Sequence, residues 1–363
     1  MTGGGTSTRE SERQGDWPGG GTLTDTAPGA ELRALMEEVE DGLRTFLARE
    51  SFRWAREDGR GSEPALAVSE LVGAGGKRLR PRFLLSGYLA AGGSPAHAPV
   101  RAAMALELLH VSALIHDDVM DDADRRRARP TVHARHAGLH RDRGWFGESR
   151  RYGESVAVLA GDLAWAYADH LMAGASRAVG EEWFALKGEL IAGQAMDVTA
   201  AAELTPDAGL ARHIAVLKSG RYTVQRPLTL GALLAGRTDL TPVFEAYGEA
   251  LGEAFQLRDD LIDAFGDGTV SGKPVRQDFG RGKTTLLLAL ATRSDARVRE
   301  LVERGEVELL HERLSGGAVH ARVEARIDHL VERARAALTG ADLPPEWRRE
   351  LTAVASLVAY REN

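Results

Sequence analysis

Asp117-Asp118-Val119-Met120-Asp121 and Asp259-Asp260-Leu261-Ile262-Asp263 share one pattern, D-D-x-x-D, and each stands inside an otherwise apolar, helix-like stretch. The first and last Asp of each cluster are four residues apart, so a helix places them on one face. Like charges at this spacing destabilise a helix by roughly 0.2–0.5 kcal/mol, so a pattern that occurs twice indicates a use. Mg²⁺ prefers one or two carboxylates together with water and substrate phosphates. The two clusters therefore predict facing magnesium sites that hold a diphosphate between them.

Basic residues follow the first cluster directly, at Arg125, Arg126, Arg127 and Arg129. A guanidinium group clamps phosphate oxygens through two parallel hydrogen bonds. Metal-binding carboxylates with Arg side chains a few residues away are what a diphosphate site requires. A solvated, charged helix end is the alternative for this run on its own.

A second basic group lies upstream in GGKRLRP (75–81). Its glycines let the backbone approach an anion, and we expect Lys77 and Arg80 to point the same way from one helical turn. A helix start with surface cations is the alternative. This stretch is not a Walker loop, because Leu71 stands where the first glycine would be needed.

A third basic group follows the second cluster, where Lys273 and Lys283 flank Asp278. GKTT (282–285) resembles the end of a Walker loop, but Gln277 replaces its first glycine, so nucleotide binding is disfavoured.

Lys218-Ser219 and the pair Gln194 and Asp197 are weaker candidates, since each alone also fits a surface or helix-contact position. Together, the acidic and basic groups predict a cavity with two anion sites. One anion bridges metals, and the other is held by Lys and Arg without metal. This asymmetry fits a reaction between two diphosphates, of which only one must leave.

His133, His136 and His140 have helical spacing, which leaves a metal site as an alternative. With no Cys and no clear carboxylate partner among them, we expect three solvated surface side chains. His116, next to Asp117, is expected only to form a hydrogen bond within the bundle.

The composition of the 363 residues favours a helical protein with a sizeable core, since 43% are hydrophobic and 6% aromatic. The net charge of −7 argues against nucleic-acid binding, because no excess of cations is available for phosphates. The absence of Cys excludes disulfides and thiolate zinc sites and fits a cytoplasmic location. No secretory signal and no apolar stretch of membrane-spanning length are expected.

Two units are expected along the chain. Residues 1–29 are rich in Gly, Ser and Thr and predict a disordered tail. Residues 30–363 predict a single all-α domain, with helices separated by Gly and Pro. The polar, Arg-rich segment 138–154 is expected to be a mobile loop between helices.

The chain strongly resembles the trans-isoprenyl diphosphate synthase (polyprenyl synthetase) family from about residue 35 onward. The matching blocks, in the family's order and spacing, are GGKRLRP (75–81), LIHDDVMDDADRRRARPTVH (114–133), the GQ…D of 194–197, LKS (217–219) and FQLRDDLIDAFGD…GKPVRQDFGRGKTTLLL (255–288). The resemblance implies an all-α bundle with a deep central cavity, usually as a homodimer, and three Mg²⁺ per active site.

The resemblance also implies a role for each matching residue. Metal coordination is implied for Asp117, Asp121 and Asp259, with Asp118, Asp260 and Asp263 in support. Binding of the allylic diphosphate is implied for Arg126, Lys218, Ser219, Lys273 and Lys283, with Gln256 close to the reacting carbons. Binding of isopentenyl diphosphate is implied for Lys77, Arg80, His110 and Arg127.

The implied reaction begins with ionisation of an allylic diphosphate (dimethylallyl, geranyl or farnesyl) to a carbocation. Metals and cations stabilise the leaving diphosphate, the double bond of isopentenyl diphosphate attacks the cation, and a proton is lost. The chain departs from the usual pattern at Arg125, Ala128-Arg129, Ser219 and Arg276. None of these departures removes a metal ligand or a principal cation, although they put loop geometry in doubt.

Product length depends on residues that lie before the first cluster. One helical turn rises about 5.4 Å, similar to one extended isoprene unit, so Ser112 and Ala113 form the first possible floor for the growing tail. Both are small, which disfavours an early stop, and Leu109, Leu108 and Leu106 lie deeper. We therefore expect a geranylgeranyl (C20) product, with farnesyl or a longer chain as alternatives. Phe at both 112 and 113 should shorten the product, whereas close helix packing is the alternative role for these small residues.

Two other functions remain as alternatives. A class I terpene cyclase usually has an N-S-E-like second motif and lacks the Lys77 and Arg80 anion site, whereas this chain has a second D-D-x-x-D and the basic set. A non-catalytic subunit of a heteromeric synthase tends to lose one acidic cluster, and both are intact here.

Overall fold

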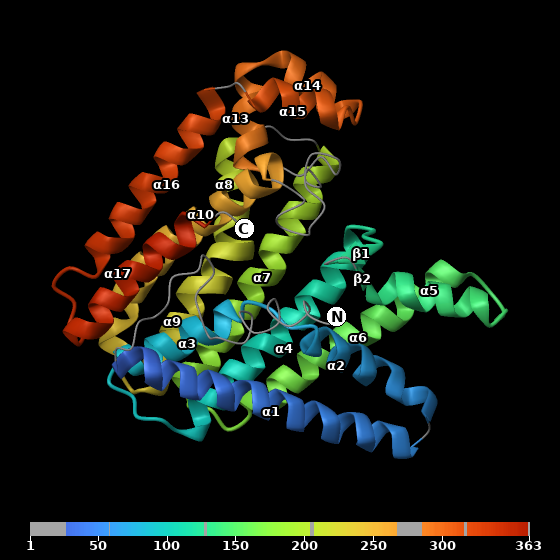
Figure 1. Cartoon of the computed structure of the whole chain (residues 1–363), viewed down its shortest axis with the longest axis horizontal. Helices are drawn as coiled ribbons and strands as arrows, with labels where there is room; N and C mark the ends of the chain where they lie inside the picture. Colours follow the sequence, from blue (N-terminus) through green and yellow to red (C-terminus); the bar gives the residue numbers. More distant parts are fainter. Residues whose placement is uncertain are drawn as a thin grey trace, which may run out of the picture.

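The computed structural model describes residues 27–57, 59–126, 129–203, 207–266, 285–315 and 318–361, and within them the fold is all-α, as predicted (Figure 1). The first half contains α1 (Ala27–Glu57), η2 (Gly59–Ser62), α2 (Glu63–Gly73), α3 (Leu79–Ala90), α4 (His97–Met120), β1 (Arg125–Arg126), β2 (Arg129–Pro130), α5 (Val132–Asp142), α6 (Ser149–Met172) and α7 (Arg177–Glu203). The second half contains α8 (Ala208–Ile214), η3 (Ala215–Gln225), α9 (Arg226–Leu234), η4 (Thr238–Leu240), α10 (Thr241–Phe265), α13 (Leu286–Ser294), α14 (Ala296–Glu303), α15 (Val307–Ser315), α16 (Ala318–Ala337) and α17 (Pro345–Ala359).

Two expected boundaries differ from the structure. Helix α1 begins at Ala27, inside the expected tail, because Pro28 is tolerated in the first turn of a helix, where its missing N–H is not needed. The expected loop 138–154 is wrong for most of its length, since α5 continues to Asp142 and α6 begins at Ser149. The Arg residues of this segment are compatible with helix, and Gly144 and Gly147, both with positive φ, mark the short connection.

Helix α4 carries the first acidic cluster and lies in the core. Every residue from Ala102 to Leu109 is buried, and α4 packs against α3 and α6. Among the described residues, α4 is the one helix long and apolar enough to cross a membrane by length and composition, contrary to the expectation of no such stretch. Its apolar window is 72% buried inside the fold. This is weak evidence for a membrane span, because a core helix has the same composition.

Glycines bring η3 and α10 into close backbone contact. A Cβ placed on Gly220 of η3 would lie 2.9 Å from the carbonyl carbon of Gly252 in α10, closer than real side chains approach. A Cβ on Gly248, one turn earlier in α10, would lie 2.8 Å from the backbone nitrogen of Gln225. The two elements therefore pack without side chains between them, which sets the position of the second acidic cluster, farther along α10.

The chain of η3 is wound as a π-helix of 11 residues, Ala215–Gln225. π-Helical geometry is rare and occurs mostly at functional sites. The segment carries Lys218 and Ser219, both among the predicted site residues. Sequence patterning predicted a helix here but gave no sign of the wider winding.

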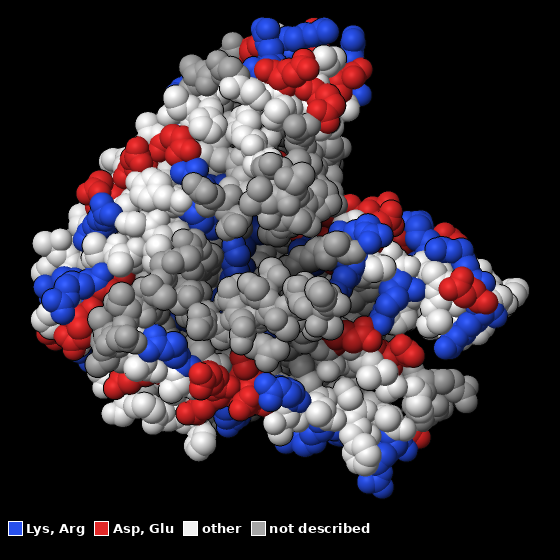
Figure 2. Space-filling model, viewed as in Figure 1, with Lys and Arg blue, Asp and Glu red and all other residues white. Residues whose placement is uncertain are grey.

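The acidic end of α4 lies at the base of an arm that projects from the body. In Figure 1, β1 and β2 follow the end of α4, and α5 extends from them to the right. Figure 2 shows the outline notched between this arm and the helices above it, with acidic and basic side chains gathered at the base of the arm.

Candidate active site

Asp118 of the first cluster is buried and paired with Arg126 of β1. The Arg126 Nε donates to Asp118 Oδ1 and Oδ2 at 2.9 and 3.0 Å, and its Nη2 lies 2.8 Å from Oδ1. Burial raises the pKa of Asp118 above its usual range, although the bonds from Arg126 oppose this shift. The short β1–β2 hairpin, in which Arg125 pairs with Pro130, thus folds the basic run back onto the acidic helix end.

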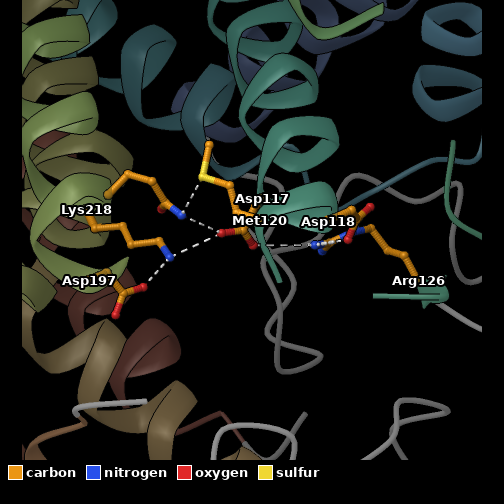
Figure 3. A network of polar contacts seen from close by, with 7 residues as sticks. Asp117, Asp118, Met120, Arg126, Asp197 and Lys218 are labelled. Atoms are coloured by element: carbon orange, nitrogen blue, oxygen red, sulfur yellow. Dashed lines mark hydrogen bonds and ion pairs between the residues drawn. The ribbon is translucent and has the colours of Figure 1, made fainter. Parts of the chain in front are cut away.

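Asp117 accepts two polar contacts from η3 and α7, on the side opposite Arg126. The Lys218 Nζ of η3 lies 3.2 Å from Asp117 Oδ1, and the Gln194 Nε2 of α7 donates to the same oxygen at 3.1 Å. Lys218 also donates to Asp197 of α7 at 2.6 Å. Figure 3 shows Lys218 between Asp117 and Asp197, with Asp118 and Arg126 on the far side of the α4 end. Gln194 and Asp197, weak candidates in the sequence, therefore belong to this network.

The second cluster lies in the last turns of α10. Asp260 is buried, and Gln256 donates to its Oδ1 at 2.7 Å. Asp259 is the more accessible carboxylate, with a side chain 44% exposed, and it pairs with Arg361 from the C-terminal end of the chain. Asp263 is half-buried one turn further on. No sequence pattern points to Arg361, because its partner lies 102 residues away along the chain.

The two clusters are linked through η3. Lys218 reaches Asp117 on α4, and Gly220, two residues later, packs against Gly252 on α10. Asp259 follows Gly252 by seven residues, about two helical turns. A single short element therefore touches the residues of the first cluster and the helix of the second.

The donor set fits Mg²⁺, which takes carboxylate oxygens and retains positions for phosphate and water. Asp117 and Asp259 have partly exposed carboxylates, with side chains 22% and 44% exposed. Within the described ranges, no group of three or more His, Asp or Glu side chains could enclose a metal by itself.

The predicted second anion site gathers around Tyr222. The Arg80 guanidinium lies over the Tyr222 ring, 4.3 Å from its centroid, and the His110 ring lies 6.3 Å from it. The Tyr222 ring is buried, and burial raises the pKa of its hydroxyl. The prediction that Lys77 and Arg80 share one helical turn is wrong. Helix α3 begins only at Leu79, and Lys77 is an exposed residue before it.

The reason for this interruption is Arg78. It adopts a left-handed conformation with φ 48°, which costs a non-glycine residue of the order of 1 kcal/mol. Its side chain is buried, where it pairs with Glu107 of α4, donates to Glu40 of α1 at 2.7 Å and donates to the Val72 carbonyl at 2.8 Å. These bonds fasten the loop that carries Lys77. The sequence pattern did not distinguish Arg78 from Lys77 and Arg80, because all three are cations that could bind an anion.

Three predicted ligands, Arg127, Lys273 and Lys283, lie outside the residues that the structure describes. Ser219 is half-buried on η3, next to Lys218.

The expectation of solvated histidines on α5 is wrong. His133, His136 and His140 are 6%, 1% and 5% exposed. Local partners make burial possible: His136 contacts the Val132 carbonyl at 2.8 Å, and His140 contacts the Phe146 carbonyl at 3.1 Å. The three histidines have helical spacing because they lie on the face of α5 that packs against α6. His116 lies 3.3 Å from the Val158 carbonyl, a contact within the bundle as expected.

The predicted floor residues divide between two faces of α4. Ala113 is half-buried, on the same stripe as His110 and Asp117, whereas Ser112 is completely buried. Leu109 is also completely buried, as are the deeper candidates Leu108 and Leu106. The partly open stripe therefore descends from Asp117 past Ala113 to His110, and below it the residues of α4 from Leu109 back to Ala102 are buried.

Known proteins resemble both the sequence and the structure. Residues 65–312 match the family model described as polyprenyl synthetase. A short chain isoprenyl diphosphate synthase of Methanothermobacter thermautotrophicus is 30% identical and covers 90% of this chain and 100% of its own length. A geranylfarnesyl diphosphate synthase of Aeropyrum pernix is 34% identical over 65% of this chain and 72% of its own.

A solved structure is similar throughout the chain. Geranylgeranyl pyrophosphate synthase from Corynebacterium glutamicum, crystallised with isoprenyl diphosphate and magnesium, superposes with a TM-score of 0.84 at 32% identity. The match covers 90% of this chain and 98% of that one. The names of these relatives span more than one product length, so the comparisons leave product length open.

Proposed function

We propose that this chain joins isopentenyl diphosphate to an allylic diphosphate and releases diphosphate. The chain belongs to the polyprenyl synthetase family and is an enzyme of the polyprenyl diphosphate synthase class. The network that carries this proposal is Lys218 of η3 between Asp117 and Asp197, on an element packed against the helix of Asp259. The network places a cation beside Asp117, one of the metal-ligand candidates.

Mg²⁺ suits the allylic site, with Asp117, Asp121 and Asp259 as the ligands and three ions expected. When bound, the ions would neutralise charge on the leaving diphosphate. Lys218 and Arg126 stand beside the ligands and would donate to the same diphosphate as its negative charge develops. Gln256, held by its bond to Asp260, lies in the same turn of α10 and would face the reacting carbons.

The acceptor diphosphate would occupy the metal-free site of Lys77, Arg80 and His110. Arg80 is preorganised over Tyr222, and the backbone before α3 is fastened by Arg78. Two cations without a neighbouring acidic cluster bind a diphosphate without activating it as a leaving group. This asymmetry determines which substrate ionises.

The product is proposed to be geranylgeranyl diphosphate (C20). Ala113, the small residue on the open stripe of α4 one turn before Asp117, does not obstruct a short tail. The completely buried Leu109 and Leu106 close this face about one and two turns deeper than Ala113. A stop at that depth allows a longer product than a bulky residue at 113 would.

A homodimer is proposed from an apolar stripe on α7. Phe184, Ile191 and Val198, seven residues apart, are 75%, 56% and 49% exposed. Residues at this spacing share a helix face, and exposed apolar patches of this kind mark association sites. A second copy of the chain presents the same stripe and can cover it around a twofold axis.

The test is an elongation assay with the full chain, Mg²⁺, isopentenyl diphosphate and each allylic diphosphate in turn, with product length read by mass spectrometry. Asp259→Asn and Asp117→Asn provide controls that should keep the fold but lose at least a hundred-fold in rate, since removal of transition-state charge stabilisation costs roughly 3–4 kcal/mol. A C20 product supports the proposal in full. No elongation with any primer refutes it, and a cyclic hydrocarbon from a long primer would make the protein a terpene cyclase.

A further inference from the structure

The C-terminal end of the chain is fastened to the helix of the second acidic cluster. Arg258 of α10 donates to the Ala359 carbonyl at 2.7 Å, and Arg361 reaches in the opposite direction, from the end of the chain to α10. The two contacts join the last turn of α17 to the turn of α10 that contains Asp259. The C-terminal residues are therefore part of the site wall.

The Arg361 side chain is buried within this wall, with 3% of its surface exposed. One nitrogen, Nη1, donates to the Val358 carbonyl at 2.8 Å, and the other, Nη2, donates to Asp259 Oδ1. The guanidinium group also lies over the Phe255 ring, 4.0 Å from its centroid. With a further contact from Nη2 to the Phe255 carbonyl at 3.5 Å, these interactions with α10 and α17 hold it in one orientation.

The consequence concerns the carboxylate of Asp259. This side chain is 44% exposed, so without a partner it would rotate among several conformations. Because the contact from Arg361 is to Oδ1, Oδ2 is the oxygen that this ion pair leaves for a metal. Outer-shell partners of this kind orient metal ligands, and their removal typically lowers metal affinity by 10–100-fold.

We propose that Arg361 is a positioning residue for the metal-dependent reaction: it orients Asp259 so that a single oxygen coordinates the metal–diphosphate complex. This inference rests on the proposed function. Arg361 touches neither substrate nor metal; it acts through Asp259. Departure of Arg361 on metal binding is disfavoured, because its buried charge would lose a carbonyl, a carboxylate and an aromatic partner together.

The test measures metal binding directly, apart from catalysis. Mn²⁺ serves as a spectroscopic probe in the presence of inorganic diphosphate, and free Mn²⁺ is counted by electron paramagnetic resonance. Arg361→Gln should bind Mn²⁺ roughly 10-fold more weakly than the unmodified chain. Arg349→Gln, at an exposed Arg on α17, the helix that Arg361 follows, is the matched control and should bind unchanged. In the Asp259→Asn background, Arg361→Gln should have no further effect.

Arg361→Lys keeps the charge but has one donor group in place of a fork, so it cannot hold Val358 and Asp259 together. It should lose affinity several-fold, and it provides the measurement if Arg361→Gln fails to fold, as judged by its thermal midpoint. Equal or tighter Mn²⁺ binding by a folded Arg361 variant would overturn the proposal, since the arginine would then be only a counter-ion that the metal displaces. Absence of elongation by the unmodified chain would instead refute the proposed function, and the binding comparison would still decide the role of Arg361.

Discussion

Replacing Ala113 by Phe should shorten the product. Ala113 lies four residues before Asp117 on α4, about 6 Å along the helix axis, and on the same partly open stripe. Leu109 and Leu106 lie about 12 and 16 Å below Asp117. A Phe ring at 113 therefore raises the floor by about 6–10 Å, which corresponds to one or two isoprene units of about 5 Å each. The expected product changes from C20 to C15 or C10.

The neighbouring Ser112 makes a useful contrast. It is 0% exposed, and its hydroxyl has no hydrogen-bond partner within the described residues. A Phe at 112 would overpack the core, at a cost of about 1–3 kcal/mol, so the double replacement expected from sequence confounds two effects. We therefore expect a change in product length from replacement at position 113 and a loss of stability from replacement at position 112.

The assay is elongation from dimethylallyl diphosphate with excess isopentenyl diphosphate, followed by mass spectrometry of the dephosphorylated alcohols. Ala113→Ser, which keeps a small side chain on the same stripe, is the control and should leave the product unchanged. If Ala113→Phe is folded and active but still makes the original chain length, the tail does not follow this face of α4, and the proposed floor is wrong.

Three other perturbations follow from the described contacts. Gly252→Ala should lower the free energy of unfolding by about 1–3 kcal/mol, because a Cβ there meets the Gly220 backbone; an unchanged midpoint in chemical denaturation would show that η3 and α10 are not closely packed in solution. Burial would raise the pKa of Glu189, but its bonds to Arg226 and Arg221 hold that pKa below the ordinary value of 4.5. The stabilisation from the Glu189 carboxylate is therefore full above about pH 4.5 and is lost as the pH falls through the lowered pKa. Glu189→Gln should destabilise the protein at pH 7 and have little effect in strong acid. A difference in thermal midpoint that does not change with pH would contradict this. Ile191→Asp should convert a dimer into monomers on analytical ultracentrifugation, and an unchanged sedimentation coefficient would place the dimer contact elsewhere.

Local pattern was sufficient for the fold class and for the acidic clusters. A run of apolar residues at helical spacing, with aspartates one turn apart, determines a face of a helix whatever it packs against. The same reasoning failed for the histidines of α5, because helical spacing is equally the mark of a buried face, and burial depends on α6. It failed again at 138–154, where polar composition resembled a loop, although the arginines are good helix formers.

The partners of the site residues required the folded chain. Lys218 could be named as a cation, but its position between Asp117 and Asp197 depends on η3 and α7 lying together. Arg78 and Arg361 gave no signal in sequence, because their partners Glu107 and Asp259 are distant along the chain. Charged residues are ordinarily solvated, and only packing shows which of them are enclosed with a partner.

The sequence by itself therefore determined the helical class, the two carboxylate clusters and the chemistry that their oxygens and nearby cations suit, since these depend on residue type and short-range spacing. Only the tertiary structure decided which cation meets which aspartate, which of Ser112 and Ala113 faces the open stripe, and that the last turns of the chain belong to the wall of the second cluster. The physical reason is the range of the interactions. Helix faces repeat every few residues, whereas ion pairs and close glycine contacts join residues that are distant in sequence and neighbours only after the helices have packed.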